Sequence, residues 1–151
     1  GVELVYGGGQ IGLMGIVADA ALAAGAPVIG VIPTALHGRE ISHPGLSKLV
    51  VVPDMQERKR QMFALSDAVA VLPGGLGTLD EAFEAITLRQ LGFFDKPIVL
   101  VDTLGYWQPL LALVDRVIAS GFAKPDATQL YAAVARAEDV ILACFGKDLR
   151  P

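Results

Sequence analysis

The chain has 151 residues, of which 53% are hydrophobic, and a formal net charge of −4. The length predicts a single domain over residues 1–151 that folds without a metal or disulfide, and the lone Cys144 indicates a reducing, cytoplasmic compartment. The acidic balance disfavours nucleic-acid binding, and the longest promising uncharged run, residues 20–38, is interrupted by prolines and glycines, which argues against a membrane-spanning helix.

Short β-branched runs alternate with longer helical stretches along the whole chain. This alternation predicts an α/β protein with a doubly wound parallel sheet and helices on both faces. The apolar surplus is interpreted as buried strands and a subunit interface, so a homodimer or larger assembly is expected. Strands are expected at residues 2–6, 27–32, 48–52, 67–72, 97–102 and 130–135, and helices at 13–24, 54–66, 78–91, 106–120 and 137–145, with Gly25 and Gly121 at helix ends.

Residues 33–47 form a connection too long for a tight turn. Long loops in compact domains are often functional, and sites in open parallel sheets lie beyond the carboxyl ends of the strands. His37 and His43 are interpreted as loop or lining residues, because no metal-binding spacing accompanies them. The sequence therefore predicts a site without a metal.

The first glycine-rich segment, Gly7 to Gly12, has the spacing G-x-G-x-x-G between a strand and a helix. An NAD site also needs an acidic residue about 20 positions further on, at the end of the next strand. That strand ends in Ile32-Pro33-Thr34, without a carboxylate. NAD is therefore disfavoured, and the glycines either approach a ligand or only allow tight packing.

The second glycine-rich segment, Pro73 to Thr78, also joins a strand to a helix. Free amides at a helix N-terminus are well suited to phosphate. The chain contains no G-x-x-x-x-G-K-[ST], so a nucleoside-triphosphate loop is not expected. We expect a monophosphate held by backbone amides and the Thr78 hydroxyl.

Thr78-Leu79-Asp80-Glu81 also matches a capping box, in which Glu81 would bond the Thr78 amide. Acidic residues are favoured in a first helical turn whatever the function. Glu81 is therefore either structural or placed beside the sugar of a bound nucleotide.

Arg58 and Lys59 follow Met55 by three and four residues. This spacing places both cations on the same helix face as Met55 and Met62. Cations facing inward need anionic partners, because an unpaired buried charge costs several kcal/mol. The alternative is that both side chains extend to solvent at the helix start.

These residues together resemble the Lonely Guy family, cytokinin-activating phosphoribohydrolases that are often mislabelled as lysine decarboxylases. Residues 73–81 fit the family motif P-G-G-x-G-T-x-x-E. The likeness is supported by Gly7-Gly8-Gly9, by Arg39-Glu40-Ile41 and by the segment from Met55 to Lys59, and it covers almost the whole chain. Gln56 stands where the family usually has His.

The resemblance implies a Rossmann-like fold and hydrolysis of the N-glycosidic bond of a nucleoside 5′-monophosphate, either N6-prenylated AMP or AMP, without metal or cofactor. It implies that Arg58 and Glu81 are catalytic. It also implies a homodimer or larger assembly with the site near the interface. The substrate-binding residues are expected to be Glu40, Lys59, Gly74, Gly75, Leu76, Gly77, Thr78, Leu79, Asp80, Thr87, Gly8 and Gly9.

The chain begins where the family's second strand begins, so we expect one further strand, loop and helix, roughly 30 residues, before it. Two other functions stay open. A nucleotide carrier on the same fold would need the phosphate loop but not the Arg58 and Glu81 pair. A pyridoxal-phosphate decarboxylase would need a Schiff-base lysine, for which Lys59 is the only plausible candidate.

Overall fold

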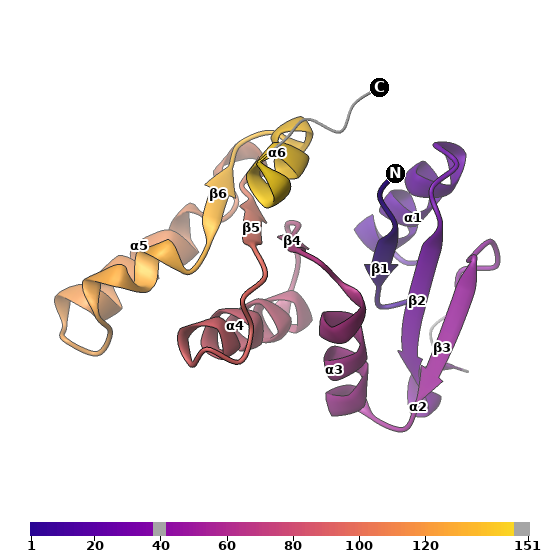
Figure 1. The fold of residues 1–151 in the computed structure, drawn as a ribbon, viewed down its shortest axis with the longest axis horizontal. Coiled ribbons are helices and arrows are strands. Elements are labelled where there is room, and N and C mark those ends of the chain that lie inside the picture. The colour runs from indigo at the N-terminus through magenta and orange to yellow at the C-terminus, as the bar shows by residue number, and fades with distance from the viewer. Residues whose placement is uncertain (38–41, 147–151) are drawn as a thin grey trace. The chain divides into compact units, whose positions relative to one another are not determined.

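The computed structural model describes residues 1–37 and 42–146. The chain divides into two compact units, Gly1–Ser66 and Asp67–Pro151. Each unit contains a three-stranded parallel sheet whose strands alternate with helices (Figure 1). The predicted α/β class with parallel strands is therefore confirmed, whereas the single domain over residues 1–151 stays a prediction.

The first unit has its sheet in the order β1-β2-β3, and β2 is buried along its whole length. The Cα of Gly30 in β2 pairs with Tyr6 on one side and Leu49 on the other. Helix α3 packs against all three strands. The elements are β1 (Leu4–Tyr6), α1 (Leu13–Ala23), β2 (Val28–Pro33), α2 (Thr34–His37), β3 (Lys48–Val52) and α3 (Met55–Leu65).

The second unit repeats the pattern with the order β4-β5-β6. Its central strand β5 is buried at all four positions, from Ile98 to Val101, as expected for an apolar strand covered on both faces. The elements are β4 (Val69–Val71), α4 (Leu76–Gln90), β5 (Ile98–Val101), α5 (Gln108–Ala119), β6 (Ala132–Val134) and α6 (Val140–Phe145), with short 3-10 helices η1 (Thr103–Gly105), η2 (Pro125–Gln129) and η3 (Ala137–Asp139).

All six predicted strands and all five predicted helices are present, with shifts at their ends. Gly25 and Gly121 each follow the C-cap residue of α1 and α5, with positive φ angles of 75° and 79°, which confirms their predicted role at helix ends. Two predictions were wrong in detail. Helix α4 begins at Leu76 instead of residue 78, and the short helix α2 was not expected.

Within the described ranges, no helix has the length and apolar character needed to cross a bilayer. The apolar residues of the central strands are instead buried, with Val31, Ile32, Val99 and Leu100 fully enclosed. The described part of the run from residue 20 to 38 is divided among the end of α1, β2 and α2, which agrees with the expectation that its prolines and glycines interrupt it.

The first unit brings two backbone segments into close contact at Gly8 and Gly30. A Cβ at Gly30 would lie 2.7 Å from the Gly8 Cα and 2.6 Å from the Leu46 Cδ1. Gly8 itself has a φ of 77°, a conformation that glycine adopts most readily. The loop after β1 can therefore lie directly on β2 because Gly30 has no side chain and Gly8 adopts a backbone conformation that suits glycine.

We expect Gly30→Ala to destabilise the protein by about 1–3 kcal/mol, because the added methyl group overlaps the Gly8 backbone. Urea unfolding measures the difference. The control is Gly77→Ala, since a Cβ at that helical position meets no atom of the described chain within 4 Å. That variant should be neutral or more stable by up to about 1 kcal/mol. Equal stability of wild type and Gly30→Ala would contradict the predicted overlap.

Candidate active site

Helix α3 carries the two cations that the sequence placed on an inward face. Asp54 caps the helix by accepting a hydrogen bond from the Glu57 amide at 2.8 Å. Arg58 is 8% exposed and Lys59 is 5% exposed. The inward orientation is confirmed, and the alternative in which both side chains extend to solvent is wrong.

The Arg58 guanidinium is held by neutral acceptors. Its Nη2 donates to the Gly7 carbonyl at 3.2 Å and its Nη1 to the Met55 sulfur at 3.7 Å. Its Nε is buried, and no acceptor for it lies among the described residues. An anionic ligand beside this guanidinium would offset the cost of burying its charge.

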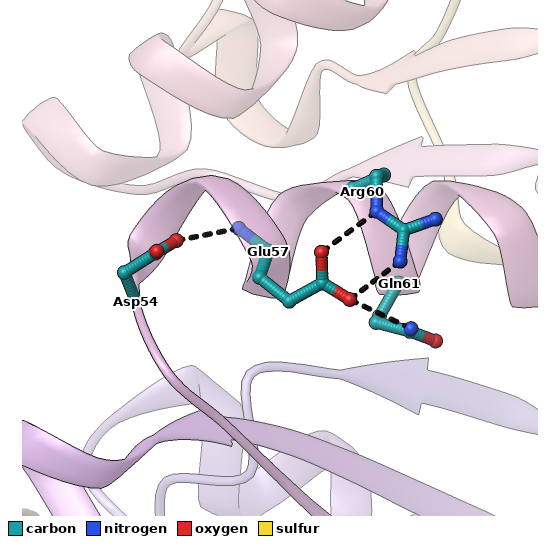
Figure 2. Close-up of polar contacts among 4 residues, drawn as sticks. All are labelled: Asp54, Glu57, Arg60 and Gln61. Atoms are coloured by element: carbon teal, nitrogen blue, oxygen red, sulfur yellow. Dashed lines mark hydrogen bonds and ion pairs between the residues drawn. The ribbon is translucent and has the colours of Figure 1, made fainter.

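The outer face of α3 has a separate set of polar contacts, shown in Figure 2. The Glu57 carboxylate accepts a hydrogen bond from Arg60 Nε at 2.7 Å and one from Gln61 Nε2 at 2.8 Å. The hydrogen bond from Arg60, followed by that from Gln61, lowers the pKa of Glu57 from 4.5 to about 2. The Glu57 carboxylate therefore forms its hydrogen bonds within α3.

The first glycine-rich loop packs tightly against its own unit. A Cβ at Gly7 would overlap the Arg58 guanidinium, and a Cβ at Gly15 would overlap the Gln10 carbonyl. The Tyr6 hydroxyl donates to the Gly9 carbonyl at 3.1 Å, and burial, with Asp19 nearby, raises the pKa of that hydroxyl. Packing therefore explains the glycine at position 7, while the predicted substrate contacts of Gly8 and Gly9 stay predictions.

His43 fastens the end of the long connection to α1. Its Nδ1 accepts from the Gly45 amide at 3.1 Å, so the proton of the neutral ring lies on Nε2, which faces Asp19 Oδ1 at 2.9 Å. The ring is buried, and its backbone amide donates to the Gly8 carbonyl. His43 is thus a structural residue of the loop.

The second glycine-rich loop ends in the N-terminus of α4. Gly75 is the N-cap residue, and its carbonyl accepts the Leu79 amide at 3.1 Å. Thr78 is therefore the third helical residue and Glu81 the sixth. The predicted capping box is wrong, because its two members both lie inside a helix that begins earlier than expected.

The glycines of this loop differ in what they permit. A Cβ at Gly74 would overlap the Thr78 hydroxyl, so glycine is needed there for the loop to lie against the helix. At Gly75 and Gly77 a Cβ would meet no atom of the described chain within 4 Å, and neither φ is positive. Close approach by a ligand would explain why these two positions have no side chain.

The same helix start presents backbone donors. The amides of Leu76, Gly77 and Thr78 precede the first intrahelical donor, Leu79, and such amides favour an anion. Leu76 is 85% exposed. This end of α4 therefore has the donors for a phosphate and room for it to approach.

The remaining predicted residues of α4 follow this start at different depths. Glu81 is half-buried, and Asp80 and Thr87 are exposed. Thr87 lies nine residues beyond Thr78, a rise of roughly 13 Å along the axis and about half a turn out of phase. A single ligand could contact both Thr78 and Thr87 only if it extended along the helix. Otherwise Thr87 would contact a ligand bound to a neighbouring subunit.

The loop after β5 contains polar residues to which the sequence analysis assigned no role. Tyr106 Oη donates to the Gly74 carbonyl at 2.7 Å, and Trp107 Nε1 donates to the Val71 carbonyl at 3.3 Å. Both contacts support the loop that leads into α4. The signal that could have revealed them is the position of Asp102, Tyr106 and Trp107 at the carboxyl end of a predicted strand.

The structure groups the predicted site residues by unit. Gly8, Gly9, Arg58 and Lys59 belong to the first unit, and the segment from Gly74 to Thr87 belongs to the second. Glu40 lies outside the described residues. Among those that are described, no cluster of three or more His, Cys, Asp or Glu side chains could hold a metal.

Comparison with known proteins identifies relatives over nearly the whole chain. A family model described as "Possible lysine decarboxylase" matches residues 14–144. A rice protein (Oryza sativa subsp. japonica) named probable cytokinin riboside 5′-monophosphate phosphoribohydrolase LOGL1 is 48% identical over 93% of this chain and 63% of its own length.

Two further relatives are named cytokinin riboside 5′-monophosphate phosphoribohydrolase without qualification. LOG1 of Arabidopsis thaliana is 43% identical over 93% of this chain and 66% of its own length. LOG of Oryza sativa subsp. japonica is 42% identical over 94% of this chain and 59% of its own length. The chain thus spans about three-fifths of the length of these curated relatives.

We expect Gly7→Ala to displace the Arg58 guanidinium and to destabilise the protein by about 1–3 kcal/mol. Combining it with Arg58→Ala should remove the overlap, so the double variant should be more stable than the sum of the two single effects by at least about 1 kcal/mol. Urea unfolding of the four proteins in this cycle measures the coupling. Strict additivity would show that the two residues are not in contact.

The second prediction from this helix concerns pH. Because the pKa of Glu57 is lowered in the folded protein, its stabilising effect is present above pH 4.5 and is lost as the pH falls toward about 2. Glu57→Gln should be less stable than wild type at pH 7, and the gap should narrow between pH 4.5 and pH 3. Arg60→Gln, measured beside it by urea unfolding, should lose most of the same pH dependence. A gap that does not change with pH would rule out this origin.

Proposed function

Because the chain belongs to the Lonely Guy family, we propose that the protein hydrolyses a nucleoside 5′-monophosphate. The matching family model is the one described as "Possible lysine decarboxylase". Water replaces the base at the anomeric carbon, the glycosidic C–N bond breaks, and the departing nitrogen gains a proton. The products are the free base and ribose 5-phosphate. The substrate is N6-prenylated AMP, AMP or both.

The observation that carries the proposal is the start of α4. Gly75 and Gly77 leave open space where side chains would stand, and the amides of Leu76, Gly77 and Thr78 precede the first intrahelical hydrogen bond. A phosphate monoester fits such a group of donors, and the helix dipole adds to its binding. Leu79 and Asp80 would complete the substrate-binding segment.

The buried Arg58 supports the same substrate class from the first unit. Its guanidinium is fixed by the Gly7 carbonyl and lacks an anionic partner among the described residues. A nucleotide phosphate or the sugar hydroxyls would provide acceptors for its remaining donors. In this proposal Arg58 positions the nucleotide, with Lys59, Glu40, Gly8, Gly9 and Thr87 as further contacts.

Glu81 is the proposed catalytic carboxylate. Breaking a glycosidic bond develops positive charge at the anomeric carbon, and a carboxylate beside that carbon stabilises the charge and orients the attacking water. Glu81 follows the phosphate-binding amides by one helical turn, which suits a group that faces the sugar while the phosphate stays at the helix end.

We also propose a cytoplasmic homodimer or larger assembly. Phe83 on α4 and Leu91 at its C-terminal end are 39% and 61% exposed, and Phe93 just beyond is 78% exposed. Burying such side chains against a second copy would be favourable. The only cysteine of the chain, Cys144, is buried and unpaired, in keeping with a reducing compartment.

The test is incubation of the purified protein with AMP and, separately, with N6-isopentenyl-AMP, followed by chromatography for free base and ribose 5-phosphate. Glu81→Gln should retain nucleotide binding but lower kcat by about 100-fold or more, because the developing charge loses its counter-charge. Arg58→Ala should lose both turnover and affinity. The matched control is Glu138→Gln in η3, an exposed residue that should cleave at the wild-type rate.

The outcomes separate the candidate functions. Release of base by wild type and not by Glu81→Gln supports the hydrolase, and the preferred nucleotide identifies its substrate. Tight nucleotide binding without release of base would favour the carrier. Undiminished turnover by Glu81→Gln would remove this carboxylate from the mechanism.

A further inference from the structure

The loop after β5 donates hydrogen bonds to the segment that contains the glycine-rich loop of the second unit. Tyr106 Oη donates to the Gly74 carbonyl at 2.7 Å across 32 residues of sequence. The Tyr106 side chain is half exposed, at 49%, so burial alone does not fix its position. The hydrogen bond to the Gly74 carbonyl is therefore the contact that orients the Tyr106 hydroxyl.

Tyr106 is held in place by a buried carboxylate. Asp102 directly follows β5 and is 9% exposed. Its Oδ1 accepts a hydrogen bond from the Trp107 amide at 2.6 Å, and its Oδ2 accepts one from the Gln108 side chain. The Trp107 ring is 2% exposed and meets the Tyr106 ring edge-on, with centroids 4.9 Å apart. The phenol is therefore fixed by a rigid neighbour.

The turn that brings Tyr106 into place is conformationally demanding. Leu104 has a φ of 56°, and positive φ is uncommon for residues other than glycine. Such conformations persist only where the surroundings enforce them. Here the surrounding contacts are those of Asp102 and of Tyr106 itself, so the turn and the hydrogen bond to Gly74 support one another.

The hydrogen bond acts on the peptide plane between Gly74 and Gly75. This peptide bond is trans, so its carbonyl and its N–H point in opposite directions. Fixing the Gly74 carbonyl on Tyr106 directs the Gly75 N–H away from Tyr106. A Cβ at Gly75 would meet no atom of the described chain within 4 Å, so a ligand can approach this residue closely. Donation to the carbonyl also polarises the amide and makes its N–H a stronger donor.

We propose that Tyr106 is a positioning residue that aims the Gly75 amide at the phosphate of the bound nucleotide. This inference rests on the proposed function, because it requires an anion at the start of α4. The Asp102 and Trp107 contacts hold Tyr106, and Tyr106 holds the peptide plane. Tyr106 itself acts only through the backbone and takes no part in bond cleavage.

The test is Tyr106→Phe, which removes one hydroxyl and keeps the ring against Trp107. The KM for AMP, or for N6-isopentenyl-AMP if that nucleotide is the one cleaved, should rise about 3- to 10-fold, while kcat changes less than about 2-fold. The inhibition constant of inorganic phosphate should rise by the same factor. That of adenine, which has no phosphate, should be unchanged. A general loss of structure would instead raise the inhibition constants of phosphate and adenine together.

Tyr131→Phe is the matched control, because it removes a tyrosine hydroxyl from the same unit in the segment before β6. It should leave all four constants at their wild-type values. If wild type cleaves the nucleotide and Tyr106→Phe has unchanged KM and phosphate inhibition, this inference is overturned and the proposed function stands. Equal weakening of phosphate and adenine would also overturn it. If wild type neither binds nor cleaves either nucleotide, the proposed function fails, and the inference fails with it.

Discussion

The local structure of both units depends on glycines at positions where a Cβ would overlap a neighbouring segment. At Gly7 the missing Cβ gives room to the Arg58 guanidinium, and at Gly74 it gives room to the Thr78 hydroxyl. At Gly30 it lets the loop after β1 lie on the neighbouring strand. Parallel strands deliver their loops to one edge of a sheet, where polar groups from helices must also fit. Glycine resolves the competition for space, because the backbone itself then becomes the hydrogen-bonding partner.

The buried side chains of Asp102, His43 and Arg58 differ in how many of their polar atoms have hydrogen-bond partners. Asp102 accepts hydrogen bonds with both carboxylate oxygens, and His43 uses both ring nitrogens. Such hydrogen-bonded groups stabilise the loops that contain them. Arg58 differs, since it contacts a carbonyl and a thioether and retains a buried Nε without an acceptor in the described part of the chain. A charge left in this state is typical of a binding site, where the ligand completes the set of hydrogen bonds.

Much of the fold follows from local pattern. Buried β-branched runs and helical periodicity place all six strands and the five main helices. Arg58 and Lys59 face inward as predicted, although Met55, from which their spacing was counted, is 40% exposed. The capping box failed because Thr78 and Glu81 have the right spacing but compete with Gly75, which adopts the N-cap conformation earlier in the chain. Spacing alone cannot tell which of several nearby residues begins a helix. The support from Tyr106 was missed because it joins residues 32 positions apart.

The amino-acid sequence by itself determined the α/β class, the two glycine-rich loops, the family and the residues expected to bind and cleave a nucleotide. These properties are encoded in short segments, where periodicity, helix-end chemistry and motif spacing act over a few residues. Only the tertiary structure decided which glycines are needed for packing and which leave open space, which polar groups are satisfied, and which side chain donates to the second glycine-rich loop. Those features depend on distances between segments far apart in the chain, and no local pattern records such distances.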